Sequence, residues 1–428
     1  MKVVRQYLER YAAPEAPAIL EALTGAQNGP TSPPWQQVLV IPAYKENAAL
    51  LNSLQQFSQL LLILVLNRPD TEADPHCNDA LRNSLSCFKA LGHYPQANSR
   101  LYEFGEKRGE GRSEERGEEK SAEKYEGSGN HILLVERAEP LPQKEGVGLA
   151  RKIGCDIALA LSAGGFVTSP WIHCSDADAI LPADYFAAAR AVQGDNKMVA
   201  LTYPFEHIPP ADARERRAIA LYEAYLHHYV EGLRKARSPY AFHTIGSCIA
   251  VKTDAYALVR GFPRRAAGED FYLLNKVAKH GSVHTPHCEP LRLSARLSSR
   301  VPFGTGPAMA RLLSSDQPES VALFYDPRCF EALAALIRFV EDHGFPGSKV
   351  EDLAAQLNNH PELLTAVIHL GLENFLEHAK KQCADQGAFI DQYHQWLDGF
   401  RTLKLINALS RRWPKLTAAE SAQRQTHR

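Results

Sequence analysis

The sequence has no C-x-x-C pair among its eight cysteines, no apolar run long enough to cross a bilayer, and almost no net charge. The scattered cysteines argue against a structural zinc site and fit free thiols in a reducing compartment. The most apolar run, from Leu60 to Leu66, is far shorter than the roughly 20 residues of a membrane-spanning helix. With 48 Lys and Arg against 49 Asp and Glu, the chain lacks the overall basic field of a nucleic-acid-binding protein.

No signal peptide is visible at the start of the chain. The opening MKVVRQYLERYAAPEAPAIL mixes charged with apolar residues and has no continuous apolar core before a small-residue cleavage site. We therefore expect a cytoplasmic protein without a transmembrane segment, and leave open that it acts at a membrane surface. Hydrophobic residues make up 45% and charged residues 23% of the 428 positions, as in soluble globular proteins, and the length allows two or three domains.

Breaker residues and changes of periodicity divide the chain into three expected regions. Residues 1–34 are predicted to form a helical extension and a linker, because a cluster of Asn, Gly and Pro follows a helical pattern. Residues 35–306 alternate strand and helix patterns, which predicts an α/β domain. Residues 307–428 have helical spacing almost throughout, with helices expected at 331–340, 362–378 and 389–409.

The middle region opens with a strand, a helix and a second strand, expected at 38–41, 47–62 and 62–66. This order within about 30 residues is typical of a parallel sheet, whose ligands bind at the carboxyl ends of the strands. Further strands are expected at 132–135, 171–174 and 198–203, and further helices at 148–161, 211–235 and 271–279.

Residues 105–130, GEKRGEGRSEERGEEKSAEKYEGSGN, interrupt this alternation. The segment has one aromatic residue and no Leu, Ile or Val. Such a composition cannot bury enough apolar surface to offset the entropy of ordering, so we predict a mobile charged insertion on the surface.

Two acidic motifs are the first candidates for chemistry. Asp176-Ala177-Asp178 follows an expected strand, and two carboxylates one residue apart can direct oxygen atoms toward a hard divalent cation. Glu269 and Asp270 precede an expected helix. Both motifs also have a purely structural explanation, because Asp178 can turn the chain and acidic residues are favoured in the first turn of a helix.

A third candidate combines glycines with positive charge at the start of the helix expected at 148–161. Lys144 precedes Gly146 and Gly148, and Arg151 and Lys152 follow. Glycines permit a close backbone approach, and a helix N-terminus with nearby cations suits a phosphate. A tight turn followed by a solvated helix face is the alternative.

The order of these pieces resembles that in family 2 glycosyltransferases. Residues 38–46, VLVIPAYKE, resemble the opening strand and loop of the family, V-I-P-x-Y-N/K-E, and residues 148–152, GLARK, resemble G-x-x-x-A-R-N. The D-x-D motif, GSCIA from Gly246, GFP from Gly261 and GED from Gly268 follow in the family order. The resemblance covers residues 36–306, and the ordered set is specific where each motif alone is weak.

By this resemblance the fold is GT-A, a Rossmann-like α/β domain with a mostly parallel sheet flanked by helices. The ligands would be a nucleotide-diphosphate sugar, a divalent Mg²⁺ or Mn²⁺, and an acceptor with a hydroxyl group. The resemblance and the phosphate argument together give the residues expected to contact the donor: Pro42, Tyr44, Glu46, Asn67, Lys144, Gly148, Arg151, Asp176, Gly246 and Ser247. Asn67 stands where many members have an aspartate pair at the base, which leaves the identity of the base open.

The resemblance also implies the catalytic and metal residues. Asp270, preceded by Glu269, matches the general base of inverting members, and Asp176 with Asp178 would bind the metal. In many GT-A enzymes a histidine near the end of the domain completes the metal shell, so His284 and His287 are candidates, although a lone histidine is often a surface residue. Glycosyl transfer with inversion is the function expected.

Two other functions stay open at this point. Retaining GT-A enzymes share much of this layout, so Asp270 alone does not settle the stereochemistry. A catalytically silent protein that binds a nucleotide sugar and acts as a scaffold is the alternative from another class. The joint presence of Asp176, Asp178 and Asp270 weighs against a silent protein, because a silent copy is free to lose them.

Overall fold

The computed structural model describes residues 2–25, 35–105, 129–137, 139–192, 194–297, 304–356 and 361–421. Most of the predicted charged insertion, residues 106–128, lies outside these ranges. The chain forms two compact units that alternate along the sequence. Unit 1 comprises Met1–Phe205, Thr244–Leu273 and His284–Leu293, and unit 2 comprises Glu206–His243, Leu274–Val283 and Ser294–Arg428. The division into residues 1–34, 35–306 and 307–428 expected from the sequence stays a prediction.

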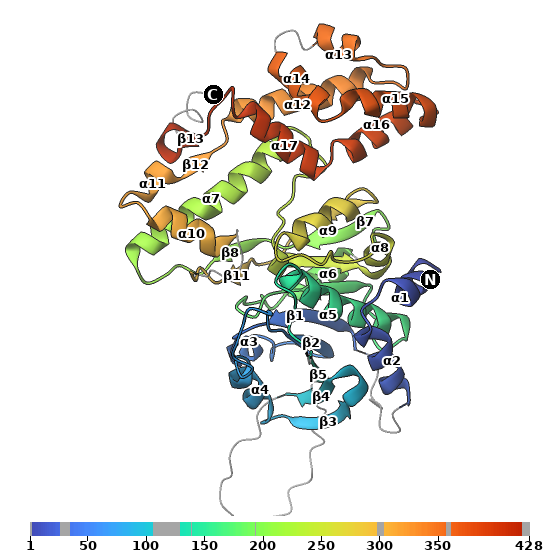
Figure 1. Ribbon diagram of the computed structural model, residues 1–428, viewed down its shortest axis with the longest axis vertical. Helices are drawn as coiled ribbons and strands as arrows, with labels where there is room; N and C mark the ends of the chain where they lie inside the picture. The colour runs from blue at the N-terminus through green and yellow to red at the C-terminus, as the bar shows by residue number, and fades with distance from the viewer. Residues whose placement is uncertain are drawn as a thin grey trace, which may run out of the picture. The chain divides into compact units, whose positions relative to one another are not determined.

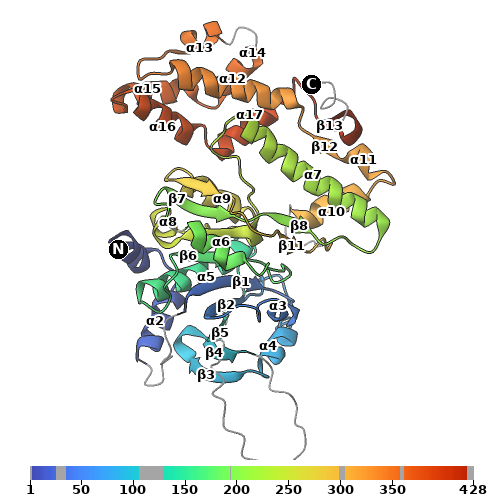
Figure 2. The ribbon, with the colours of Figure 1, turned by 180° about the vertical axis from the view of Figure 1, so that it is seen from behind.

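A sheet of nine strands, in the order β10-β7-β9-β6-β1-β2-β5-β4-β3, forms the centre of unit 1 (Figure 1). The strands are β1 (Gln37–Ala43), β2 (Leu60–Leu66), β3 (Lys89–Tyr94), β4 (Ser99–Phe104), β5 (Asn130–Glu136), β6 (Trp171–Cys174), β7 (Met198–Thr202), β9 (Ile249–Lys252) and β10 (Ser282–His284). The pairs β1–β2, β1–β6 and β2–β5 are parallel, whereas β9 runs antiparallel to β6 and β7. The hairpin of β3 and β4 ends the sheet beside β5, as the view from behind also shows (Figure 2).

Helices cover both faces of the parallel centre. Helix α5 (Gly146–Ala163) lies on the face of Val40 and Val65, where Gly154 lets it approach so closely that a Cβ at position 154 would meet a Val40 methyl group at 2.3 Å. The opposite face carries His173 of β6, whose ring contacts Phe186 of α6 (Tyr185–Val192) with centroids 4.8 Å apart. Side chains alternate across a strand, so α5 and α6 pack on opposite faces. The α/β class expected from the sequence is confirmed.

The N-terminal helices α1 (Lys2–Arg10) and α2 (Glu15–Gly25) pack against α5. Asp156 of α5 is fully buried and accepts hydrogen bonds from the hydroxyls of Tyr7 and Tyr256 at 2.6 and 2.8 Å. Lys152, one turn earlier on α5, donates to Asp156 at 2.8 Å and to the Tyr7 hydroxyl at 2.6 Å. A buried charge is tolerated only when it is paired, and in this network the Lys152 ammonium and the Asp156 carboxylate pair with each other.

The helix expected at 47–62 is wrong. Only α3 (Ala49–Asn52) forms, and residues 60–62 belong to β2. Beyond the end of α3, the Asn130 carboxamide donates to the Phe57 carbonyl at 2.5 Å and accepts from the Leu60 N–H at 2.9 Å, which holds this later stretch in a non-helical conformation. The apolar residues of the segment are buried without a helix, so the periodicity reported burial rather than helical structure.

The remaining short elements of unit 1 surround the sheet. They are α4 (Asp79–Leu85), the 3₁₀ turns η1 (Pro95–Ala97) and η2 (Gly246–Cys248), and α8 (Thr253–Leu258). Three further elements, β8 (Phe205–His207), α9 (Glu269–Val277) and β10, contain boundaries between the units. Strand β8 pairs with β11 (Leu291–Leu293) in a two-stranded sheet.

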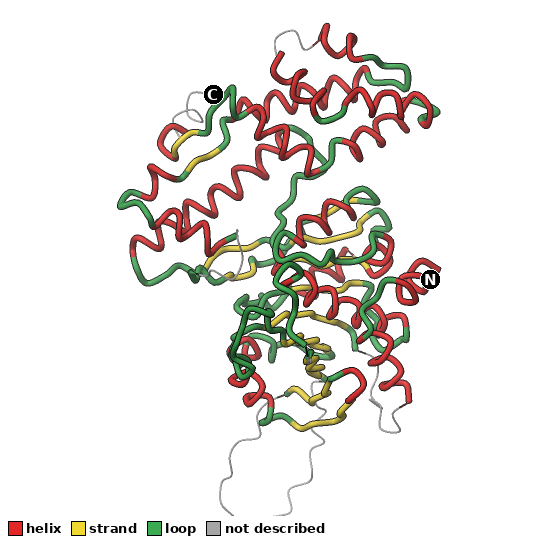
Figure 3. The backbone as a smooth tube through the Cα atoms, viewed as in Figure 1, coloured by secondary structure: helices red, strands yellow, loops and turns green. Residues whose placement is uncertain are grey.

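Unit 2 is mainly helical, as the residues after 307 predict (Figure 3). Its elements are α7 (Ala213–Lys235), α10 (Thr305–Leu313), α11 (Pro318–Val321), β12 (Leu323–Phe324), α12 (Pro327–His343), α13 (Val350–Gln356), α14 (Pro361–His369), α15 (Leu372–Gln382), α16 (Gln386–Trp396), α17 (Gly399–Leu409) and β13 (Leu416–Thr417). No helix in the described ranges combines the length and the apolar composition needed to span a bilayer.

Two of the long C-terminal helices expected from the sequence are each divided. Gly371, with φ of 89°, separates α14 from α15, and a left-handed conformation of this kind favours glycine. Asp398 separates α16 from α17 by accepting the Arg401 N–H at 3.1 Å as an N-cap. Apolar spacing continued across both breaks because both sides of each break face the same core.

Candidate active site

Polar residues stand where the parallel strands of unit 1 end. Tyr44 follows β1, Asn67 follows β2 and Asp176 follows β6. The parallel register of the three strands places these ends at one edge of the sheet. Open parallel sheets bind ligands in the crevice beyond this edge, which makes it the candidate site.

Arg151 stands at the centre of the site. This residue of α5 is almost completely buried, and its Nη2 donates to Asp176 Oδ1 at 2.5 Å while its Nε donates to Glu269 Oε1 at 2.9 Å. Its Nη1 donates to the backbone carbonyl of Gly246 at 3.0 Å. One guanidinium thus joins the end of β6, the turn η2 and the first turn of α9, three segments that are far apart in the sequence.

Glycines make this convergence feasible. A Cβ at Gly246 would lie 2.6 Å from Arg151 Nη2, so a side chain at position 246 would require the guanidinium to shift. At Gly148 a Cβ would lie 2.6 Å from the carbonyl oxygens of Pro263 and Arg265, and the Gly148 N–H donates to the Arg265 carbonyl at 3.0 Å. The expectation that Gly148 permits a close backbone approach is met, although the partner is the segment before α9.

The ionisation of the cluster follows from its burial and its charges. Burial of Arg151 disfavours its charge, but the carboxylates of Asp176 and Glu269 outweigh this effect and raise its pKa. Burial also raises the pKa of Glu269, against the pull of Arg151. Burial, together with the adjacent negative charge of Glu269, raises the pKa of Asp270 to about 7. Asp270 therefore changes its charge near neutral pH, as a general base does.

Two carboxylates face one guanidinium here, so the cluster has excess negative charge even while Asp270 is protonated. Asp176 keeps 40% of its side chain exposed, and Asp178 is half-buried. These carboxylate oxygens form a donor set that fits a hard divalent cation, which proteins hold through one or two carboxylates plus phosphate oxygens. Among the described residues no three His, Cys, Asp or Glu side chains gather as a ligand group.

The two histidines predicted as metal ligands do not gather with Asp176 and Asp178 among the described residues. His284 and His287 are both exposed, and among the described residues neither joins Asp176 and Asp178 in a group of three. Their proposed metal role has no support from this arrangement.

A second polar cluster lies beyond the ends of β1 and β2. The Tyr44 hydroxyl donates to Glu72 Oε2 at 2.5 Å, and the Lys45 ammonium pairs with the same oxygen. Hydrogen bonds from these two groups lower the pKa of Glu72 to about 2. Asn78 accepts the Lys45 N–H at 2.8 Å and donates to the Asn67 carbonyl at 2.9 Å, which ties the two loops together.

The other predicted contact residues are placed as follows. Pro42 is buried within β1, and the half-buried Glu46 lies in the loop after it. Ser247 is buried in η2 beside Gly246. Lys144 is exposed before α5.

Sequence reasoning missed several residues of these clusters. Glu72 and Asn78 lie in a polar stretch without strand or helix periodicity, and nothing in the sequence assigns them to the loops after β1 and β2. The buried pair of Lys152 and Asp156 had a signal, because charges of opposite sign at i and i+4 pair on one helix face.

Comparisons with known proteins give structural similarity alone. No family model matches the chain, and no curated protein matches it. Among solved structures, residues 1–349 of TarS from S. aureus in complex with UDP-GlcNAc align with a TM-score of 0.38 and 12% identity, covering 84% of this chain and 89% of that chain. The mannosyltransferase PcManGT from Pyrobaculum calidifontis, in complex with GDP-Man and Mn²⁺, aligns with a TM-score of 0.35 and 16% identity, covering 92% and 99%.

Proposed function

We propose that this chain is a glycosyltransferase of GT-A type, which transfers a sugar from a nucleotide-diphosphate sugar to a hydroxyl acceptor with inversion. The observation that carries the proposal is the Arg151 cluster. Its hydrogen bonds join the GLARK, D-x-D, GSCIA and GED segments, the motifs that resemble family 2 glycosyltransferases in their order along the sequence. Residues 35–306 would hold the activity.

The donor would bind across the carboxyl edge of the sheet. The loops that carry Tyr44, Glu46 and Asn67 would hold the nucleoside, since they follow the central strands β1 and β2. Asp176 would contact the nucleotide, and its orientation is set by the bond from Arg151. The positive end of the α5 dipole suits the phosphates, and Gly148 fixes this end of the helix by donating its N–H to the Arg265 carbonyl.

Asp176 and Asp178 would hold Mg²⁺ or Mn²⁺. When bound, such an ion stabilises the negative charge that develops on the departing diphosphate. The excess of carboxylates over cations in this cluster supports a metal requirement, because a diphosphate and an unneutralised acidic cluster repel each other.

Asp270 would act as the general base. In the proposed step the acceptor oxygen attacks the anomeric carbon, the bond from that carbon to the diphosphate oxygen breaks with its electron pair, and the acceptor proton moves to an Asp270 carboxylate oxygen. A pKa of about 7 gives Asp270 enough basicity for this transfer and leaves much of it ionised near neutral pH. Glu269 would act by fixing Arg151 rather than by touching substrate.

A thermal-shift screen of the full chain against nucleotide sugars, with and without Mn²⁺, tests the proposal. Ligands that bind only the folded state raise the melting temperature by mass action. We expect one donor class to raise it, and only when Mn²⁺ is present. The absence of any donor-dependent shift would contradict the proposal.

A further inference from the structure

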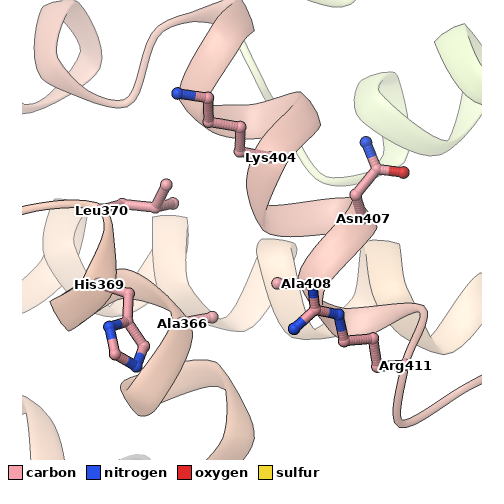
Figure 4. A pocket seen from close by; sticks show the side chains of 7 residues that line it. All are labelled: Ala366, His369, Leu370, Lys404, Asn407, Ala408 and Arg411. Atoms are coloured by element: carbon pink, nitrogen blue, oxygen red, sulfur yellow. The ribbon is translucent and has the colours of Figure 1, made fainter.

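Unit 2 contains a pocket of about 540 Å³ between α14 and α17 (Figure 4). Its apolar lining comes from Ala366, Leu370 and Ala408, its cationic lining from Lys404 and Arg411, and its other polar lining from His369 and Asn407. No carboxylate of the described residues lines it. The charges and the apolar surface thus meet in one concave place.

Small side chains on the two helices leave the space of the pocket unfilled. Ala366 of α14 and Ala408 of α17 are too small to fill the groove between the helix backbones. The helices run antiparallel, because Arg412 beyond the end of α17 pairs with Glu362 at the start of α14 at 3.0 Å. Near the start of α17, Arg401 donates to the Leu370 carbonyl at 3.4 Å. The groove is therefore fastened at both ends.

The charges in the pocket lack counter-charges. Among the described residues, no carboxylate lies within salt-bridge distance of His369, Lys404 or Arg411, whereas the next residue, Arg412, has Glu362. Lys404 lies in α17 and Arg411 in the turn after its end, and both side chains are exposed. Asn407, between them, already accepts a hydrogen bond from the Tyr325 hydroxyl at 2.8 Å, which fixes its position.

We propose that this pocket binds a phosphorylated amphiphile, with the phosphate at the cationic side chains and the apolar portion on the alanine and leucine surface. An arginine fork and a lysine ammonium both suit the several oxygens of a phosphate. A free inorganic anion would use only the charges, and the adjoining apolar lining indicates a ligand with hydrocarbon attached. The proposal is independent of glycosyl transfer.

Titration calorimetry of the full chain with hexyl phosphate and with inorganic phosphate tests the proposal. We expect hexyl phosphate to bind more tightly than inorganic phosphate, and its affinity to fall at least about tenfold in Lys404→Gln and in Arg411→Gln, as expected for the loss of a charge-assisted hydrogen bond. Arg338→Gln is the matched control, because it removes the same charge from an exposed side chain of α12 that does not line the pocket. Circular dichroism checks that each variant is folded.

Vesicles distinguish the two sources of such a ligand. Sedimentation with phosphatidylcholine vesicles that contain phosphatidic acid, but not with phosphatidylcholine alone, indicates a lipid headgroup; hexyl phosphate binding without sedimentation indicates a soluble phosphorylated molecule. Both results support the pocket if they depend on Lys404 and Arg411. Equal affinity for hexyl and inorganic phosphate, equal losses in Arg338→Gln, or no binding of any probe would overturn it.

Discussion

Arg151 and Gly246 are so close that a methyl group at position 246 would lie 2.6 Å from the Arg151 Nη2 atom. The guanidinium also donates to the Gly246 carbonyl at 3.0 Å. The absence of a side chain at 246 is thus a condition for the bonds that Arg151 makes to Asp176 and Glu269. If the site acts as proposed, a substitution at position 246 would therefore affect donor binding through Arg151.

Gly246→Ala should therefore displace Arg151 and destabilise the protein by about 1 to 3 kcal/mol, the usual cost of overpacking. Donor binding should weaken as well, because Asp176 loses its orienting partner. Thermal melts and calorimetry with the donor measure the two effects. Gly194→Ala is the control, since a Cβ at position 194 would have no heavy atom within 4 Å. Equal behaviour of the two variants would show that the close approach does not matter.

Asp270 should make stability depend on pH. Its pKa is raised in the folded state to about 7 from an ordinary value near 4, so the folded state holds a proton that the unfolded chain has released. The resulting stabilisation is complete below pH about 4 and is lost as the pH rises through about 7. Asp270→Asn removes this titration. Its melting temperature relative to the natural protein should therefore be higher at pH 8 than at pH 5, and a difference independent of pH would contradict the assignment.

Asp178→Asn should weaken the metal-dependent binding of nucleoside diphosphate, because an amide lacks the negative charge that a hard cation prefers. We expect a loss of at least about tenfold in calorimetric affinity with Mn²⁺ present and a small change without it. Asp316→Asn is the control, since this carboxylate is fully exposed in unit 2. An unchanged affinity with Mn²⁺ would exclude Asp178 from the metal site.

The buried network around Asp156 should be important for folding. Asp156→Asn leaves Lys152 buried without its counter-charge, which typically costs about 3 to 5 kcal/mol. Tyr7→Phe removes a hydroxyl that bonds both residues and should cost about 1 to 3 kcal/mol. Chemical denaturation measures both, with the exposed Tyr11→Phe as control. A loss in Tyr7→Phe no greater than in the control would show that α1 is not held by this network.

Local patterns predicted five of the nine strands of the sheet and missed β3, β4, β9 and β10. The strand at Trp171–Cys174 and the helix around Arg151 follow from apolar periodicity, which reports burial directly. The same periodicity failed at 47–62, because α3 ends at Asn52 and the later backbone groups of Phe57 and Leu60 bond to Asn130, far along the chain.

The candidate site shows the same division. The motif order identified Arg151, Asp176, Glu269 and Asp270 as separate candidates, but no spacing in the sequence predicts that the Arg151 guanidinium joins Asp176 to Glu269. Glu72 has no motif of its own and acquires its pKa of about 2 chiefly through Lys45 and Tyr44, which approach it in the folded chain. Long-range pairing of this kind depends on the topology of the sheet.

The most direct test of the central claim is the release of nucleoside diphosphate from nucleotide sugars, with Mn²⁺ present, by the natural protein and by Asp270→Asn. We predict that the natural protein releases it from one donor class, with a rate that rises as the pH increases through about 7. Asp270→Asn should bind the same donor but release nucleoside diphosphate from it at least about 100-fold more slowly, as expected for the loss of a general base. Equal rates in the two proteins would contradict the role of Asp270, and no release from any donor would contradict the proposed glycosyl transfer.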